Sequence, residues 1–83
     1  MNLVPETDFL NLGQIQERIG YAFYRASMQV ESRAEFEERT RQAISAYRKA
    51  QGFYDSLSDE KKNGRILRCE SICSYLESWL TSD

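Results

Sequence analysis

Two cysteines four positions apart are the residues that could most readily support metal or redox chemistry in this chain. If the segment around Cys69 and Cys73 is helical, both thiols lie on one face. A zinc site needs four ligands, however, and the chain has no histidine and no third cysteine. A disulfide between the two would close too short a loop to stabilise a fold. We therefore interpret both cysteines as reduced core residues and expect no metal and no cofactor.

Acidic residues are the second candidates, because paired carboxylates can act as general acid and general base. Glu35, Glu37 and Glu38 lie close together in the sequence. They sit at the beginning of a predicted helix, next to Arg39 and Arg41, where solvated carboxylates stabilise the helix dipole. A nucleophilic cysteine would also need a base, and no histidine is present to supply it. We predict that the chain is not an enzyme.

A basic cluster opens the predicted third helix, at the end where the helix dipole disfavours positive charge. It consists of Lys61, Lys62, Arg65 and Arg68. At helical spacing Lys61, Arg65 and Arg68 share one face, which could receive an acidic segment or a phosphate group. The alternative is a solvated face whose charge is offset by Asp59 and Glu60. No aromatic platform is interleaved with these cations, which argues against nucleic-acid binding.

Aromatic and branched side chains beside the main apolar faces are the strongest indication of a binding surface. They are Tyr21 and Tyr24 in the first predicted helix and Ile72, Tyr75 and Trp79 in the third. If both of these helices pack on the second, a groove lies between them, and apolar grooves of this kind bind partner helices. The alternative is that the same rings complete a small core, which needs their large area. Trp79 could also pack on a further helix, as stacked repeats do.

The central predicted helix is the element on which the others are arranged. Its apolar face recurs at alternating steps of four and three residues and comprises Phe36, Thr40, Ala43, Tyr47, Ala50, Tyr54 and Leu57. Ser32 and Glu35 have the spacing of a capping box, in which each side chain satisfies a backbone N–H of the first turn. We predict a helix over residues 33–57.

The flanking helices show the same periodicity. Their apolar positions are Leu12, Ile15, Ile19, Ala22, Phe23, Ala26 and Val30 in the first, and Ile66, Cys69, Cys73, Leu76 and Leu80 in the third. We predict helices over residues 9–30 and 59–81, after an extended lead-in over residues 1–8. Gly20 either marks the close approach of another helix or is simply tolerated. Short joints make neighbouring helices antiparallel, so the predicted fold is all-α, an antiparallel three-helix array.

Length and charge limit the remaining function classes. The 83 residues suffice for one small domain. The 11 basic and 13 acidic residues give a net charge of −2 and a pI near 5.1, which does not favour nucleic-acid binding. No stretch has the length and apolar character of a membrane span, and the N-terminus lacks the basic and apolar regions of a signal peptide. We expect a cytoplasmic protein.

The central segment resembles the second helix of a tetratricopeptide repeat, which favours small, aromatic and small residues at the offsets of Ala43, Tyr47 and Ala50. The first helix of such a repeat is represented by Ile19, Gly20 and Phe23. The chain departs from the repeat because more residues than usual separate the two helical motifs. The proline that usually closes the repeat is also absent after Tyr54. The resemblance implies a helical hairpin followed by one further helix.

A second resemblance is to microtubule-interacting-and-transport (MIT) domains, which are three-helix bundles. The matching residues are Ala43, Ile44, Tyr47 and Ala50 in the second helix and the pair Tyr75 and Leu76 in the third. These motifs cover about half of the chain. The resemblance implies that the third helix takes part in binding short helical motifs of partner proteins.

Together these patterns predict a non-catalytic protein–protein interaction module. It would bind a helical or acidic segment in the groove between the first and third helices, or stack on further helices, with Lys61, Arg65 and Arg68 steering the partner. One alternative is a structural domain that self-associates as a homodimer. Another is an accessory regulatory domain of a larger enzyme or signalling protein.

Overall fold

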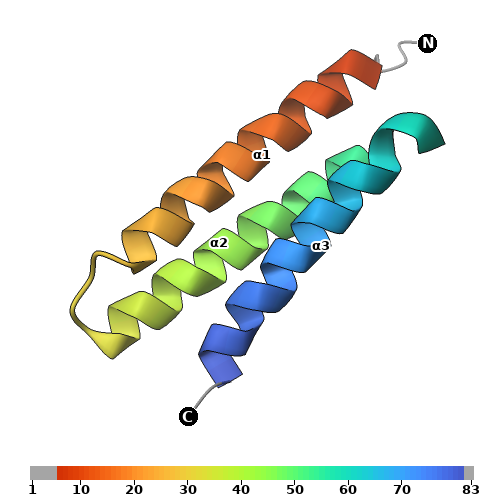
Figure 1. The fold of residues 1–83 in the computed structure, drawn as a ribbon. Helices are drawn as coiled ribbons and strands as arrows, with labels where there is room; N and C mark the ends of the chain where they lie inside the picture. Colours follow the sequence, from red (N-terminus) through yellow and green to blue (C-terminus); the bar gives the residue numbers. More distant parts are fainter. Residues whose placement is uncertain (1–5, 82–83) are drawn as a thin grey trace.

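Three helices make up the structure, a computed structural model that describes residues 6–81. They are α1 (Glu6–Ser27), α2 (Arg33–Tyr54) and α3 (Asp59–Thr81). Figure 1 shows that α2 runs antiparallel to both of its neighbours. Within residues 6–81 no strand is present. The predicted all-α, antiparallel three-helix array is confirmed.

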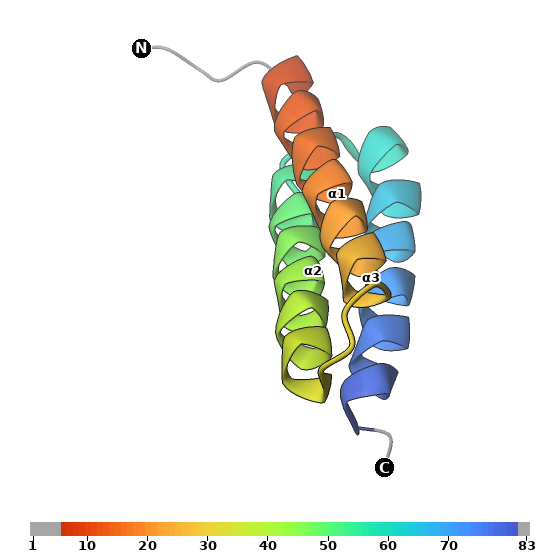
Figure 2. The same ribbon diagram turned by 90° about the vertical axis from the view of Figure 1, so that its left-hand side faces the viewer.

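The central position of α2 follows from how the helices pack. Both α1 and α3 pack extensively on α2, whereas α1 and α3 make fewer contacts with each other. Figure 2 shows α2 and α3 side by side with α1 in front of them. The result is an elongated molecule with principal extents of 49 × 19 × 17 Å. Because the molecule is narrow, side chains that lie between two neighbouring helices can remain exposed to solvent along its length.

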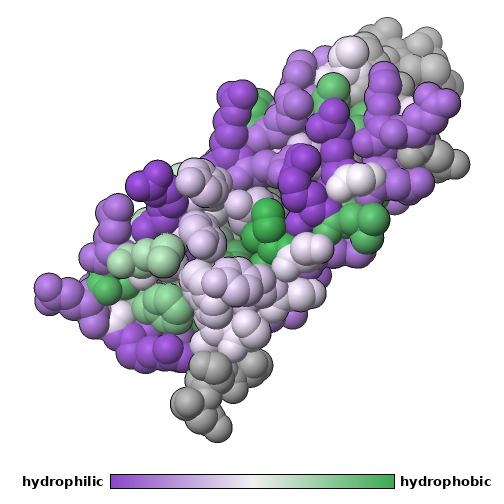
Figure 3. All heavy atoms as spheres, viewed as in Figure 1, coloured by the Kyte–Doolittle hydropathy of each residue, from purple (hydrophilic) through white to green (hydrophobic). Residues whose placement is uncertain are grey.

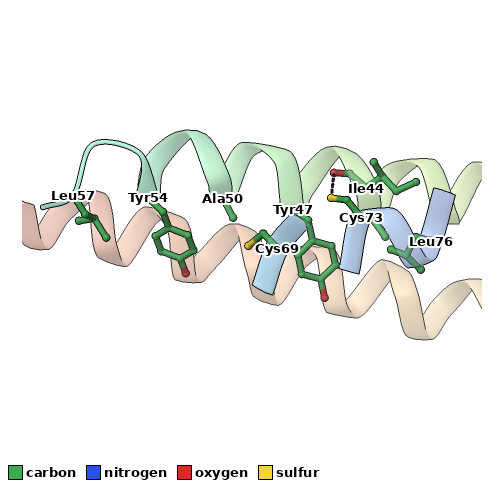
Figure 4. Close-up of a cluster of buried hydrophobic side chains, with 9 residues drawn as sticks. Ile44, Tyr47, Ala50, Tyr54, Leu57, Cys69, Cys73 and Leu76 are labelled. Atoms are coloured by element: carbon green, nitrogen blue, oxygen red, sulfur yellow. Dashed lines mark hydrogen bonds between the residues drawn. The ribbon is translucent and has the colours of Figure 1, made fainter. Parts of the chain in front are cut away.

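The core is built on the predicted face of α2. Its buried members are Thr40, Ala43, Tyr47, Ala50 and Tyr54, and Leu57 is buried in the turn that follows. From α3 the core receives Cys69, Cys73 and Leu76, also as predicted. Alanines on α2 allow the α3 backbone to approach, while Tyr47 and Tyr54 extend toward α1 (Figure 4).

Two glycines of α1 lie under those tyrosine rings. A Cβ atom at Gly20 would be 2.8 Å from Cε2 of Tyr47, and one at Gly13 would be 2.7 Å from Cδ1 of Tyr54 and closer still to its Cε1. Real Cβ atoms do not approach carbon atoms so closely. Gly20 therefore does mark the close approach of another helix, and Gly13, seven residues earlier, marks a second one.

The predicted apolar face of α1 is wrong in its first half. Leu12, Ile15 and Ile19 are 40%, 48% and 39% exposed, and Ala22 is exposed as well. The reason is steric: the rings of Tyr47 and Tyr54 fill the space between α1 and α2 and require a face without side chains there. Three positions of the predicted face, Phe23, Ala26 and Val30, are half-buried, and Val30 lies beyond the end of the helix at Ser27.

The boundaries of α1 also differ from those predicted. It begins at Glu6, so residues 6–8 of the predicted lead-in are helical, and residues 1–5 lie outside the described residues. An acidic residue such as Asp8 is favourable in the first turn of a helix that begins at Glu6. The helix ends at Ser27 because its hydroxyl donates to Tyr24 O at 2.6 Å and the chain tightens into a turn, with Met28 N donating to Arg25 O at 3.2 Å.

The two connections also contain the predicted signals. Ser32 caps α2, its hydroxyl accepting from Glu35 N at 3.3 Å, which confirms one half of the capping box. At its other end α2 stops at Tyr54 rather than at residue 57, because Leu57 N donates to Tyr54 O at 2.9 Å in a tight turn. Ser58 O then accepts from Lys61 N and Lys62 N as α3 begins, so the Asn63-Gly64 pair lies inside a helix.

One buried hydroxyl in the core carries a stability prediction. Thr40 is fully buried, and its Oγ1 has no hydrogen-bond partner. Because an unpaired buried polar group costs about 1–3 kcal/mol, Thr40→Val should raise the free energy of unfolding by about 1 kcal/mol. Urea denaturation measures this change. Thr7→Val, at an exposed position of α1, is the matched control and should stay within about 0.5 kcal/mol of wild type. A destabilised Thr40→Val variant would contradict the prediction.

Candidate functional site

A hollow between α1 and α3 brings together most of the residues predicted to form a binding surface. It has a volume of about 330 Å³. Its lining residues, which we call the aromatic groove, are Tyr21 and Tyr24 from α1, Tyr47 from α2, and Ile72 and Tyr75 from α3. Four of these five were predicted from the sequence. Tyr47 forms the floor and was assigned to the core instead, where it also belongs because it is 3% exposed.

Trp79 connects the aromatic groove to its neighbours at one end. Its ring centroid lies 5.5 Å from that of Tyr24 and 5.0 Å from that of Tyr75, in an edge-on arrangement with the latter. Its other face stacks on Phe36 of α2 at 5.8 Å. Such ring pairs contribute about 0.5–1.5 kcal/mol beyond their buried area, so Trp79 ties all three helices together at this end.

The rings of this surface are divided between core and solvent. Tyr21 is 54% exposed and Tyr75 is 56% exposed. Tyr24, Ile72 and Trp79 are half-buried. Figure 3 shows green and pale side chains over the middle and lower part of this face and purple ones over most of its upper part. The aromatic set therefore completes the core with some of its area and presents the rest to solvent.

A polar network lies one helical turn beyond the groove, because Glu17 precedes Tyr21 and Arg68 precedes Ile72 by four residues. Arg68 of α3 donates to both carboxylate oxygens of Glu17 on α1, with Nε to Oε2 at 2.9 Å and Nη2 to Oε1 at 2.6 Å. The hydroxyl of Tyr54, itself fully buried, donates to the same carboxylate. Burial raises the pKa of Glu17, but the hydrogen bonds from Arg68 and Tyr54 outweigh it and hold the pKa below its ordinary value. Glu17 is therefore ionised at neutral pH.

Sequence reasoning missed Glu17, although one signal pointed to it. It is the single acidic residue between positions 9 and 30 of the chain. A carboxylate is costly to bury unless it is paired, so a single acidic residue within a helix that packs on its neighbours favours a cation opposite, although Arg18 beside it is the nearer cation in the sequence. That cation turned out to be Arg68, which had been grouped with the surface charges.

The predicted basic face is largely occupied by contacts within the protein. Arg68 binds Glu17, and the guanidinium of Arg65 lies 5.8 Å from the centroid of the Tyr54 ring. Lys62 Nζ lies 3.7 Å from Asp55 Oδ1, and Lys61 is exposed. The carboxylates that balance Arg68 and Lys62 are therefore Glu17 of α1 and Asp55 in the turn after α2, respectively. The face borders the aromatic groove at the Arg68 end.

The cysteines occupy the core positions assigned to them. Both are buried and free, and Cys73 Sγ donates to Ile44 O at 3.9 Å. Burial raises the pKa of Cys69 to about 12 and also raises that of Cys73, so both remain thiols at neutral pH. In the part of the chain that the structure describes, no group of three or more metal-ligating side chains comes together.

The clustered carboxylates at the start of α2 form surface contacts. Glu37 accepts from Arg33 Nε at 3.1 Å and lies 3.8 Å from Arg41 Nη2, while Glu35 and Glu38 are exposed. The floor of the aromatic groove is uncharged at neutral pH, because burial raises the pKa of the Tyr47 hydroxyl to about 12.

Comparisons with known proteins leave the chain without a family assignment: no family model, no curated protein and no solved structure matches it. Among residues 6–81, no helix has the length and apolar character needed to cross a membrane.

Proposed function

We propose that this chain is a protein–protein interaction module that holds a helical segment of a partner in the aromatic groove. The observation that carries the proposal is that the exposed side chains of Tyr21 and Tyr75 both line one preformed hollow between α1 and α3. The part of Tyr21 and Tyr75 that remains exposed does not contribute to the core, and tyrosine and tryptophan are enriched where partners bind.

The dimensions of the groove suit an anchor from a helix. Arg68 lies one turn before Ile72 and Trp79 one turn after Tyr75, so the lining of the groove lies between two residues that are eleven positions apart on α3, or roughly 16 Å at 1.5 Å per residue. A partner helix of three turns covers that length. The volume of about 330 Å³ accepts one or two large apolar side chains from it, which is the usual manner of helix-in-groove recognition.

The charges around the groove favour an acidic partner segment. The guanidinium of Arg25 lies 5.9 Å from the centroid of the Tyr21 ring. On α3, Arg65 and Lys61 precede Arg68 and lie farther from the groove along the helix. The carboxylate of Glu17, one turn before Tyr21, is already paired with Arg68. A positive rim accelerates association with acidic segments and contributes less to the lifetime of the complex.

The resemblance to tetratricopeptide and MIT domains supports the same proposal, since both families bind partner segments through helical surfaces. Membership of either family is part of the proposal. So is the accessory role in a larger enzyme or signalling protein, because a small interaction module is suited to that role. Self-association would use the same rings and is separated from partner binding by sedimentation at several concentrations.

Substitution in the groove tests the proposal. A display library of helical peptides is selected on the folded chain, and the affinities of the enriched peptides are measured for wild type and two variants. Tyr75→Ala should weaken binding by about tenfold or more, because it removes an exposed wall of the groove. Leu67→Ala is the matched control: Leu67 is also on α3 and is 62% exposed, but it lies outside the groove. It should change affinity by less than about twofold.

Three results would count against the proposal. The selection yields no enriched peptide, the enriched peptides bind wild type and Tyr75→Ala with equal affinity, or sedimentation shows a dimer of the chain that buries the groove. Shift mapping by NMR locates the bound peptide independently, with the largest changes expected at Tyr21 and Ile72.

A further inference from the structure

The other flank of α1 carries a second apolar surface, which packing within the chain leaves uncovered. It consists of Leu12, Ile15, Ile19, Ala22 and Ala26, which we call the outer stripe. The first four are exposed, and Ile19 borders a hollow of about 300 Å³ whose other wall is α2. That hollow is lined by α2 residues Gln42, Ser45, Ala46 and Lys49 and does not share a residue with the aromatic groove.

Periodicity distinguishes the outer stripe from scattered surface residues. Its members recur at steps of three and four, which is the spacing of a face that packs against another helix. The stripe extends over roughly 21 Å, from Leu12 to Ala26. Leu12, Ile15 and Ile19 are each between 39% and 48% exposed and follow one another on one face rather than being scattered singly, and contiguous exposed apolar residues are typical of interaction sites.

Unpaired cations flank the outer stripe. Arg18 follows Ile15 by three residues on α1, and Lys49 lines the hollow from α2. Arg39 lies three residues before Gln42 but next to Glu38, which lies four residues before Gln42 on the same row, and Asp8 lies four residues before Leu12 on α1, so the positive charge is confined to the middle of the stripe, around Ile15 and Ile19. Arg33, Arg41, Arg48, Lys62 and Arg68 all have a carboxylate partner. In the described part of the chain, Arg18, Arg39 and Lys49 have none.

From this arrangement we infer that the outer stripe is a second docking site, and that its occupant is an amphipathic helix with an aliphatic stripe flanked by aspartate or glutamate. The aliphatic residues of that helix would cover Ile15 and Ile19, and its carboxylates would pair with Arg18 and Lys49. Complementary charge selects this partner over others. The site is separate from the aromatic groove and does not depend on it.

Two other occupants fit the surface less well. A second copy of the chain related by a two-fold axis would bring the same face to both sides of the interface, so Arg18 and Lys49 of each copy would meet a row that contains a single carboxylate, that of Asp8. A lipid bilayer also attracts cations and apolar residues, but a flat surface leaves the hollow between α1 and α2 unfilled. A helix enters that hollow as a ridge enters a groove.

Two synthetic peptides of about 18 residues test the inference, since each forms a helix of roughly 27 Å. Both carry leucine at helical spacing, and one has glutamate flanks whereas the other has lysine flanks. We expect the glutamate peptide to shift the amide signals of Ile15 and Ile19 and to bind at least about tenfold more tightly than the lysine peptide. Raising the ionic strength should weaken its binding.

Variants on the chain complete the test. Ile15→Ser with Ile19→Ser should weaken the glutamate peptide about tenfold or more, and both positions are exposed enough to leave the fold intact. Arg18→Glu with Lys49→Glu should reverse the preference in favour of the lysine peptide. Leu67→Ala, at an exposed position of α3 outside both hollows, is the control and should leave both affinities within about twofold. The affinity of the outer stripe is read from the shifts of Ile15 and Ile19, so that a peptide bound in the aromatic groove is not counted.

Four outcomes would overturn the inference. The peptides could bind equally, or their shifts could map to Tyr21 and Ile72 instead. Sedimentation could show a dimer that Ile15→Ser with Ile19→Ser dissociates, which would make a second copy the occupant. Vesicles of phosphatidylglycerol could bind through Ile15 and Ile19 when the glutamate peptide does not, which would make a membrane surface the occupant.

Discussion

Replacing Gly13 with alanine should lower the free energy of unfolding by about 2 kcal/mol and the melting temperature by roughly 10 °C. The new methyl group would lie 2.7 Å from Cδ1 of Tyr54 and closer to Cε1. The ring cannot move aside easily, because Tyr54 is fully buried and its hydroxyl is bound to Glu17. Alanine gains about 1 kcal/mol in helix propensity, which the steric conflict of about 3 kcal/mol exceeds.

Gly20→Ala should destabilise in the same direction and by less. Its methyl group would lie 2.8 Å from Cε2 of Tyr47, a ring whose far side faces the aromatic groove. Displacing this ring fills part of the groove, so Gly20→Ala should also weaken peptides that bind there. Thermal unfolding followed by circular dichroism, with the same peptides titrated into the folded variant, measures both effects.

The chain contains its own controls for these substitutions. Gly52 of α2 and Gly64 of α3 are also helical, and a Cβ atom added to either has nothing within 4 Å. Gly52→Ala and Gly64→Ala should therefore each stabilise by about 0.5–1 kcal/mol, through helix propensity alone. If all four alanine variants changed stability by the same amount and sign, the close contact between α1 and the tyrosine rings would be refuted.

The sequence was sufficient to predict the elements that depend on strong local signals. The apolar face of α2, the cap at Ser32 and the seam through Cys69 and Cys73 all appear where they were predicted. In each case the local sequence pattern allowed a single interpretation. The residues of the aromatic groove were predictable for the same reason, because they lie beside those seams on helices whose order was known.

The orientation of α1 could not be predicted, because two of its faces compete for α2. One face is aliphatic, with Ile15 and Ile19, and hydrophobicity alone favours it for the core. The other contains Gly13 and Gly20, and it wins because the large rings of α2 need a partner without side chains. Shape complementarity between two helices is a property of both sequences together, and within α1 it is recorded only by the two glycines seven residues apart, of which Gly20 alone was noted as a possible close approach.

Pairing across the bundle was hidden for a similar reason. Glu17 and Arg68 are separated by 51 positions, and each has nearer neighbours of opposite charge in the sequence. Their contact follows from the rotation of α1 that the glycines impose, since that rotation turns Glu17 toward α3. A wrong assignment of the buried face of α1 therefore also hides the ion pair between Glu17 and Arg68.

That ion pair leads to the second large effect: Glu17→Ala should lower the free energy of unfolding by about 2 kcal/mol. The contact with Arg68 accounts for the smaller part, because the Arg68 side chain is 51% exposed and exposed ion pairs contribute only about 0–1 kcal/mol. The larger part comes from Tyr54, whose hydroxyl is left in the core without its acceptor.

A double-mutant cycle separates these contributions. In a Tyr54→Phe background no hydroxyl remains to be orphaned, so Glu17→Ala should cost about 1 kcal/mol or less there. Arg68→Ala alone should likewise cost about 1 kcal/mol or less. An equal cost of Glu17→Ala in both backgrounds would show that Tyr54 and Glu17 are not coupled, and an Arg68→Ala variant as unstable as Glu17→Ala would assign the effect to the ion pair instead.

The same carboxylate makes stability depend on acidity in a defined direction. Because the pKa of Glu17 is lower in the folded protein than its ordinary value of 4.5, its contribution is complete above that pH and is lost as the pH falls through the lowered folded value. Glu17→Gln cannot ionise, so its stability should decline less than that of wild type over the same acidic range. Urea denaturation from pH 6 to pH 3 measures the two curves, and parallel curves would show that the folded environment does not favour the ionised form of Glu17.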